Sequence, residues 1–253
     1  MASLVSVRQK VVRAKEHLQA LEAEALRYFA HQPGEVVAEE EPETYRIVLK
    51  FNAKTPVPVS FPLILGDSIQ NLRSSLDYLV WELVLAANAT PDNQNMFPIC
   101  GTQEAFQSQI ARHRLRGVSV DAVAEVERLQ PYHYGQRWET SPIQVLDTFC
   151  NINKHRRLLL TVLAAHAART EFLSSESGHH VHSTLSPSYD GAEVAVSPKP
   201  SRAGEIMEVK GKCFLFITFD ERPAKGIEVS SCLFQLWNFV DKVVVPKFER
   251  FFA

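Results

Sequence analysis

The alternation of apolar and polar positions is clearest in residues 3 to 30 of the chain. There, apolar side chains recur at alternating steps of three and four residues, which is the spacing of an amphipathic helix. The apolar positions are Leu4, Val7, Val11, Ala14, Leu18, Leu21, Ala25 and Tyr28. We expect this helix either to pack on its own domain or to form a short coiled coil between two chains, because both arrangements use the same spacing.

Two further helices are indicated by apolar stripes. Residues 67 to 87 begin with Asp67 in the place of an N-cap, and Gln70 follows three residues later, as in a capping box. The chain closes with an apolar helix over about residues 229 to 252, which we expect to be kinked or interrupted at Pro246.

The longest helix of the second half is expected over residues 141 to 168. Ser141 stands at its N-cap and Pro142 at its first helical position, which are the favoured places for these residue types. We expect the helix to run without interruption to about residue 168. Two short helices, over about 104 to 117 and 120 to 130, precede it.

The remaining periodicity is that of strands. Residues 44 to 51 alternate apolar and polar side chains, so they predict a strand with one apolar face. Residues 191 to 197, 205 to 211 and 212 to 221 read as strands of an antiparallel meander. The proline, glycine and acidic residues of 31 to 43 favour an exposed loop.

These elements predict an α+β fold, in which a helical bundle carries one small antiparallel β-sheet. Because helices both precede and follow the strands, we expect a single domain over residues 1 to 253. Its helical core would span about 3 to 170, the strands of about 190 to 221 would be joined by 44 to 51, and the C-terminal helix would span about 229 to 252.

Composition narrows the classes of function. The hydrophobic fraction of 45% and charged fraction of 22% are those of an ordinary globular protein. A formal net charge of -2 argues against a chain that binds nucleic acid over its whole surface, although local basic patches are compatible with it. Four cysteines without a CxxC pair suit a reducing compartment. With no signal peptide and no span of about 20 apolar residues, we expect a cytoplasmic protein without a membrane partner.

No glycine-rich phosphate loop or common enzyme signature is present, and we therefore expect no cofactor. The most suggestive polar cluster is Asn151, Lys154, His155 and Arg156, directly before three leucines. At 3.6 residues per turn, Asn151 and His155 share a face that we expect to lean inward, whereas Arg156 lies on another.

A neighbouring helix offers partners for these groups, because Arg73 and Asp77 are four residues apart and project together. One interpretation is an interhelical polar network that fixes how the helices pack. The other gives His155 a general acid/base role, held in one tautomer by Asp77, with Arg73 or Arg156 binding an anion. Asn151 and Lys154 would then bind the substrate.

The spacing Asn151-x-x-x-His155, in a long helix that follows a helix bearing LRSSLD, resembles the HEPN superfamily. The resemblance implies a helical domain that binds or cleaves RNA or a nucleotide, with a site formed across a homodimer. In the family's motif an arginine precedes the asparagine, and here Cys150 takes that position. The segments GDSIQNLRSSLDYLVWEL, FPI, LQPY and NKHRRLL, in that order over about 65 to 160, also resemble a set of uncharacterised bacterial proteins.

A second cluster is SGHHVHS, with His179, His180 and His182. In a strand, His180 and His182 would point to the same face at a spacing that can chelate a transition metal. A third ligand would be needed, and clustered surface histidines in a loop are the ordinary alternative.

A third cluster is the segment YHYGQRW, residues 132 to 138, which places His133 and Arg137 among aromatic side chains. Such a segment can stack on a ring and bind an anionic group, or it can simply plug into the core with its polar tips in water.

Three hypotheses follow, and the sequence does not decide whether the protein is an enzyme. The first is a HEPN-like module that binds or cleaves RNA or a nucleotide. The second is a non-catalytic protein that binds a small ligand or a partner. The third is a metal-dependent hydrolase that uses His179, His180 and His182.

Overall fold

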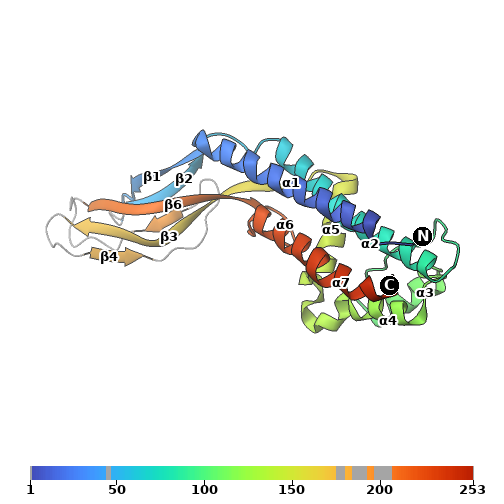
Figure 1. Ribbon diagram of the computed structural model, residues 1–253. Coiled ribbons are helices and arrows are strands. Elements are labelled where there is room, and N and C mark those ends of the chain that lie inside the picture. The colour runs from blue at the N-terminus through green and yellow to red at the C-terminus, as the bar shows by residue number, and fades with distance from the viewer. Residues whose placement is uncertain (1, 44–46, 175–179, 184–192, 197–206, 253) are drawn as a thin grey trace.

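In the computed structural model the chain forms a helical body from which a β-arm extends (Figure 1). The structure describes residues 2–43, 47–174, 180–183, 193–196 and 207–252. It is mostly helical with two small antiparallel sheets, so the predicted α+β class is confirmed at this level. No helix in these ranges is long and apolar enough to cross a membrane.

The first two helices form the long axis of the body. Helix α1 spans Val5–Ala30, and its predicted apolar positions are buried, except for Ala25, which is partly buried. Helix α2 spans Ser60–Ala86 and packs against α1. It begins seven residues before the expected N-cap Asp67, because Pro62 lies in the first turn, where no backbone donor to the preceding turn is needed.

Two short helices carry side-chain caps. Helix α3 spans Gln103–Ala111, and the hydroxyl of Thr102 accepts a hydrogen bond from the N–H of Ala105 at 3.1 Å. Helix α4 spans Val120–Arg128, capped in the same way by Ser119. A run of 3₁₀ turns follows over Pro131–Thr140, which includes the YHYGQRW segment.

Helix α5 spans Pro142–His155 and is shorter than predicted. Its start, with Ser141 at the N-cap and Pro142 in the first turn, agrees with the prediction. The expected continuation to residue 168 is wrong, because the backbone of Arg156 is extended and Leu160–Ser174 form strand β3. The run Leu158 to Ala168 is apolar except for Thr161 and His166, and such a run fits a buried strand as well as a helix.

The strands form two three-stranded antiparallel sheets, whereas one sheet was predicted. One sheet has the order β1-β2-β5 and the other the order β4-β3-β6. The strand bounds are β1 Gly34–Glu40, β2 Ile47–Ala53, β3 Leu160–Ser174, β4 His180–Ser183, β5 Glu193–Val196 and β6 Met207–Phe219.

Two of the differences have a clear physical origin. The predicted loop of 31 to 43 contains β1, because each of its residues from Gly34 to Glu40 pairs with β2. The two strands expected over 205 to 221 are one long strand, β6, because β3 pairs with it on both sides of the expected turn at Gly211. Of the strands expected to share one sheet with 44 to 51, only β5 pairs with β2, whereas β6 pairs with β3.

The C-terminal segment follows a helical path that changes pitch before Pro246. Helix α6 spans Val229–Asn238, a π-helical turn spans Phe239–Val244, and α7 spans Val245–Phe248, followed by a 3₁₀ turn at Glu249–Phe251. In the wide turn the N–H of Val245 bonds to the carbonyl of Val240, five residues back. Proline cannot donate to the preceding turn, so the predicted interruption is confirmed.

The body and the arm are joined through α5 and β6. The rings of Phe149 and Phe219 are stacked, with centroids 4.4 Å apart and planes 12° apart, and both side chains are buried. Gly66 allows α5 to approach α2 closely, because a Cβ at this position would lie 2.4 Å from Oδ1 of Asn153. Helix α5 is therefore held on one side by α2 and at one end by the arm, and its other face is open to solvent.

Candidate functional site: the exposed face of α5

The solvent-facing side of α5 is polar along its whole length. Gln144, Thr148, Asn151 and His155, which we call the α5 face, follow one another at spacings of four, three and four residues and so share one side of the helix. Asn151 and His155 are exposed, and Gln144 and Thr148 are partly exposed. The expectation that Asn151 and His155 lean inward is wrong, because α5 packs on α2 through its other side, with Leu146 and Cys150 buried.

The predicted partners Arg73 and Asp77 lie on the inner side of α5. The guanidinium of Arg73 contacts Oδ1 of Asp77 at 2.7 Å and Oδ1 of Asp147 at 3.3 Å. It also donates a hydrogen bond to the carbonyl of Phe97 at 3.0 Å, and Asp77 accepts one from the N–H of Phe97 at 2.9 Å. We call these groups the Arg73 network. They join α2, α5 and the loop at Phe97.

The side chain of Arg73 is only 11% exposed, and its donors are engaged within the protein. A buried guanidinium that holds two carboxylates and a backbone carbonyl stabilises packing and has little capacity left for a substrate. This is the arrangement expected for an interhelical polar network.

His155 does not reach this network. It lies eight residues after Asp147, which is about 12 Å along the helix axis. Its side chain is exposed and makes no hydrogen bond or ion pair with any residue that the structure describes. Asp77 therefore does not orient His155 as the acid/base interpretation requires.

The link between the network and the α5 face is Asp147, which the sequence analysis did not single out. Its Oδ2 accepts a hydrogen bond from Asn151 at 3.0 Å, and Oδ1 of Asn151 accepts one from Nζ of Lys154 at 3.4 Å. Asp147 is four residues before Asn151, so the spacing of side chains on a helix could have indicated the pair. Through this chain of contacts the Arg73 network positions Asn151 and Lys154.

Cations gather where α5 ends. Lys154, His155, Arg156 and Arg157, which we call the basic end of α5, are all exposed. Their position is favourable because the carboxyl end of a helix carries a partial negative charge.

Glu221 holds one of these cations. The guanidinium of Arg156 lies 2.5 Å from its carboxylate, which also accepts a hydrogen bond from the N–H of Leu159 at 2.7 Å. The next residue, Arg222, is exposed as well. Lys154, Arg157 and Arg222 form no ion pair with a described residue.

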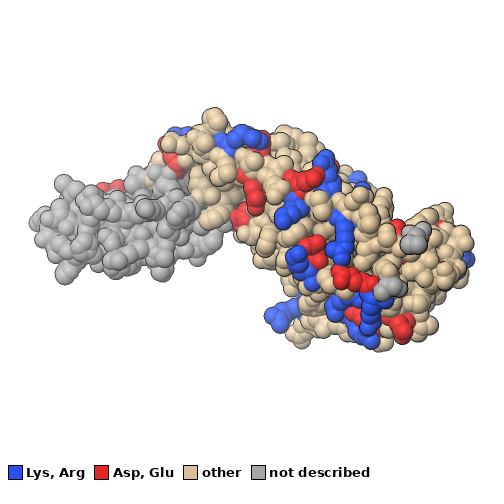
Figure 2. Space-filling view, viewed as in Figure 1, with Lys and Arg blue, Asp and Glu red and all other residues tan. Residues whose placement is uncertain are grey.

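Many cations elsewhere on the body are paired with carboxylates. Figure 2 shows positive and negative side chains interspersed over the face formed by α1, α6 and α7. Arg8 pairs with Glu249 on this face, and Glu125 is surrounded by Arg128, Lys247 and Arg250. At the basic end of α5, Lys154 and Arg157 lie close together in the chain without such partners in the described residues.

A small hollow of about 230 Å³ adjoins the other end of the α5 face. Its walls come from the 3₁₀ segment, from α5 and from the turn after β6. They are formed by Trp138, Glu139, Gln144, Thr148, Arg222 and Pro223. A partly exposed indole beside a guanidinium can stack on a ring and bind its anionic substituent.

The YHYGQRW segment thus contributes Trp138 to this hollow. His133 and Arg137, which were expected to bind the substrate, do not line it. His133 is exposed, and its Nε2 lies 3.1 Å from the carbonyl of Glu127. Arg137 is exposed, and its carbonyl accepts a hydrogen bond from Thr140. Gly101 leaves room for the indole ring of Trp138, since a Cβ at this position would lie 2.7 Å from the ring.

Cys150, in the position of the family's arginine, is buried against α2. Its thiol donates to Oε1 of Gln70 at 3.3 Å, and burial raises the pKa of this thiol. Position 150 therefore faces the helix interface, while Asn151 faces solvent. In this chain the two neighbouring motif positions therefore differ in exposure, one at the helix interface and one in solvent.

The histidine cluster falls mostly outside the described residues. His179 lies outside them, and His180 and His182 are described only as backbone of β4. No group of three metal-binding side chains occurs in the ranges that the structure describes. The metal-site prediction stays a prediction.

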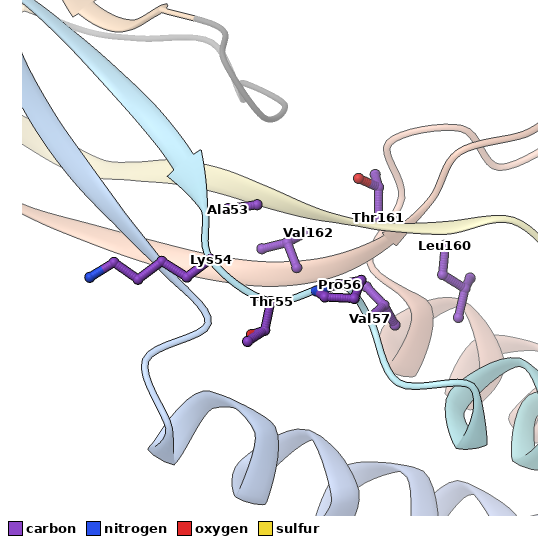
Figure 3. A pocket seen from close by; sticks show the side chains of 8 residues that line it. All are labelled: Ala53, Lys54, Thr55, Pro56, Val57, Leu160, Thr161 and Val162. Atoms are coloured by element: carbon purple, nitrogen blue, oxygen red, sulfur yellow. The ribbon is translucent and has the colours of Figure 1, made fainter.

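A larger hollow, of about 330 Å³, lies at the base of the arm (Figure 3). It lies between the segment from Ala53 to Val57 and the first residues of β3, Leu160 to Val162. Lys54 points away from the other lining side chains and pairs with Glu35. The lining thus offers apolar groups, two threonine side chains and backbone, and its one cation is already paired.

The backbone that faces this hollow belongs to an open strand edge. Phe219 of β6 bonds through its N–H and carbonyl to Ile227 and Gly226, on the side away from β3. Because pairs alternate in an antiparallel ladder, Leu160 opposite Phe219 directs its own N–H and carbonyl away from β6, and so does Val162. These groups have no partner among the described residues.

Comparison of the chain with protein-family models, with curated proteins and with solved structures gave no match. The HEPN resemblance is therefore carried only by Asn151, His155 and their setting in the sequence. What the chain does has to be inferred from the α5 face, its basic end and the Trp138 hollow.

Proposed function

We propose that the protein binds RNA or a nucleotide along the α5 face, with phosphates at its basic end and a base near Trp138. The observation that carries the proposal is the charge at that end of the helix. Lys154 and Arg157 are exposed there without an ion-pair partner in the described chain, and Arg222, which also lacks one, lies beside the hollow. Asn151 and Thr148 add neutral hydrogen-bonding groups between the cations and the hollow, as recognition of sugar and phosphate oxygens requires.

The dimensions suit a short single strand. From Gln144 to His155 the α5 face is about 16 Å long, which spans two or three nucleotides of an extended strand. The hollow beside Trp138 is smaller than an ordinary ligand pocket of about 300 Å³ or more, so it suits one ring edge or one phosphate. A flexible strand laid across the surface fits these features better than a nucleotide enclosed in a cavity.

Binding is better supported than cleavage. General acid/base catalysis needs a histidine whose tautomer and position are fixed by a neighbour. His155 has no such neighbour among the described residues, and Arg73 and Asp77 are engaged with each other. If the HEPN resemblance extends to activity, the missing groups would come from a second copy of the chain. Cleavage of RNA would therefore require a homodimer.

The test compares two double variants in their binding of a fluorescein-labelled single-stranded 12-mer RNA. In Lys154→Ala/Arg157→Ala both unpaired cations of α5 are removed. Counterion release makes each phosphate contact worth about eightfold in affinity at roughly 50 mM salt, so we expect a loss of about tenfold to sixtyfold. Fluorescence anisotropy gives the dissociation constants.

The matched control is Arg13→Ala/Lys242→Ala, which removes the same charge from exposed, ion-paired residues elsewhere on the body. It should change RNA affinity less than threefold. An equal loss in both double variants would mean that only the overall charge matters, and no loss in either would exclude the α5 face. Incubated RNA should stay uncut, and cutting that His155→Ala abolishes would instead support the catalytic interpretation.

A hydrolase that uses His179, His180 and His182 requires bound metal, which elemental analysis of the purified protein detects. The cytoplasmic location is an expectation from the sequence. A non-catalytic protein that binds a small ligand is the alternative function, and a groove on α2 is the surface that suits it.

A further inference from the structure

A second binding site, independent of the proposed RNA-binding face, is indicated by a groove of about 460 Å³ between α1, α2 and the loop before Phe97. This volume lies within the range of ordinary small-molecule sites. Helix α2 contributes most of the lining, α1 contributes one serine, and the loop contributes one asparagine. The lining residues are Ser6, Asp77, Tyr78, Trp81, Glu82 and Asn95, which we call the aromatic groove.

Two large aromatic side chains of the groove are unusually accessible. Tyr78 is 43% exposed and Trp81 is 44% exposed, and they lie three residues apart on one face of α2. Tryptophan and tyrosine normally bury most of their apolar surface, so two such rings side by side in a hollow form a surface for a ligand. Their faces carry negative electrostatic potential, which attracts cations.

The carboxylates of the groove make it negative. Glu82 accepts hydrogen bonds from the N–H of Ser3 at 2.9 Å and from the hydroxyl of Ser6 at 3.1 Å. Both donors are neutral, and no described cation pairs with Glu82. Asp77 shares the single guanidinium of Arg73 with Asp147, so one positive charge serves two carboxylates. The groove therefore keeps a negative charge in a partly enclosed space, where its effect is stronger than in bulk water.

The groove is also well ordered by its own hydrogen bonds. Asn95 accepts from the N–H of Asp92 at 2.9 Å and donates to the carbonyl of Arg116 at 3.0 Å, so its amide is committed to the loop. The carboxylate of Glu82 is committed to the start of α1 in the same way. A ligand would meet fixed walls, which lowers the entropy cost of binding.

One cation of the chain already lies on the edge of this surface. Nζ of Lys10 is 5.4 Å from the centroid of the Tyr78 ring, and it donates to Oδ1 of Asn71 at 3.3 Å. This is the distance of a cation–π contact. The chain itself thus shows which kind of group Tyr78 attracts, while the Trp81 ring has no such partner among the described residues.

We propose that the aromatic groove binds a small alkylammonium ion, with its alkyl groups against Tyr78 and Trp81 and its charge near Asp77 and Glu82. The carboxylates act through their charge, because several of their oxygens already accept hydrogen bonds from the protein. A methylated ammonium ion suits this arrangement, since it offers positive charge and apolar surface without needing hydrogen-bond acceptors.

The first measurement compares choline with its neutral isostere, 3,3-dimethylbutan-1-ol, on the complete chain. The two probes have the same shape, and only choline carries a charge. NMR of the indole N–H groups reports binding, with the signal of Trp81 assigned from its loss in Trp81→Leu. We expect choline to shift this signal and to bind about tenfold tighter than the isostere, as two ring faces and two carboxylates favour a cation.

Variants then distinguish the contributions that the charge and the aromatic rings make to choline binding from the effect of exposed apolar surface in general. Trp81→Leu and Glu82→Gln should each weaken choline binding about fivefold to tenfold, and both side chains are accessible enough for the fold to tolerate the change. Lys10→Met should tighten it a few-fold, because it removes a competing cation from the Tyr78 ring. The control Leu85→Ala changes another exposed apolar residue of α2, 39% exposed, that does not line the groove, and should leave binding unchanged.

Three outcomes would overturn the proposal. Equal affinity for choline and the isostere would make the groove an ordinary apolar surface. No shift of the Trp81 signal by choline at up to about 20 mM would exclude a cation site of useful affinity. A Trp81 signal that moves with protein concentration alone would show that a second copy of the chain covers the groove. Retained RNA binding in Trp81→Leu separates this site from the α5 face.

Discussion

Replacement of Arg73 by methionine tests whether the Arg73 network stabilises the fold or serves a ligand. The substitution keeps the unbranched apolar stem and removes the guanidinium. It leaves Asp77 and Asp147 facing each other without their shared cation, and it leaves the carbonyl of Phe97 without its donor. We therefore expect a large loss of stability at a position that the sequence placed in a catalytic site.

The magnitude follows from burial. Breaking a buried ion pair costs about 3–5 kcal/mol. Asp77 and Asp147 are 35% and 24% exposed, so water offsets part of that loss, and we expect about 3 kcal/mol. For a chain of this length, that corresponds to a fall in Tm of about 6–12 °C.

The assay is urea unfolding followed by circular dichroism, with Arg13→Met as the matched control. Arg13 is 61% exposed and pairs with Glu16 on the same helix, so its loss should cost less than about 0.5 kcal/mol. A double-mutant cycle of Arg73→Met with Asp147→Asn should show a coupling of about 1–2 kcal/mol. A loss below about 1 kcal/mol in Arg73→Met, equal to the control, would refute the structural interpretation and return Arg73 to the candidate ligand-binding residues.

Three further predictions concern single positions. Burial raises the pKa of Cys232 to about 12, so the free energy of unfolding should fall as the pH rises from the ordinary thiol pKa of about 9 towards 12. Urea unfolding at a series of pH values measures this fall, which should be smaller in Cys232→Ala. The backbone N–H of Val162 faces the hollow at the base of the arm, so it should exchange with deuterium faster than that of Thr161, which faces β6; equal rates would contradict the open edge. Gly101→Ala should displace the Trp138 ring and weaken RNA binding, and an unchanged indole NMR signal of Trp138 would contradict this.

The sequence predicted the helices correctly where one side of the element is buried and the other is exposed to solvent. The seam of α1 from Leu4 to Tyr28 and the start of α5 at Ser141 and Pro142 are examples. The periodicity at α1 and the local chemical signal at the start of α5 agree with the side that the fold buries, so the tertiary structure does not override them.

The prediction failed where a segment is apolar on all sides or where pairing partners are distant. Residues 158 to 168 have no polar face, so periodicity could not separate helix from strand. These residues form a strand because they pair with β6, some 50 residues later, and because Glu221 binds the turn at Arg156. Strand β1 was missed because its acidic residues resemble a loop until its partner β2 is known.

The candidate site was predicted in its residues but not in its geometry. The position of Asn151, Lys154 and His155 on α5 was anticipated, yet the inward face was assigned to the wrong side of the helix. The error arose because residues 158 to 168 were counted as helix, which made α5 look apolar all round. Arg222 and Trp138 reach α5 only through the turn after β6 and the 3₁₀ segment, which no local pattern encodes.

The salt dependence of RNA binding tests the central claim most directly. With three unpaired cations on phosphates, a plot of the logarithm of the binding constant against the logarithm of the salt concentration should have a slope of about -2 for a single strand. In Lys154→Ala/Arg157→Ala the slope should become shallower by about 1.4, while Arg13→Ala/Lys242→Ala should keep the slope of the unmodified protein. A slope near zero, or one that the α5 variant leaves unchanged, would contradict RNA binding at the basic end of α5.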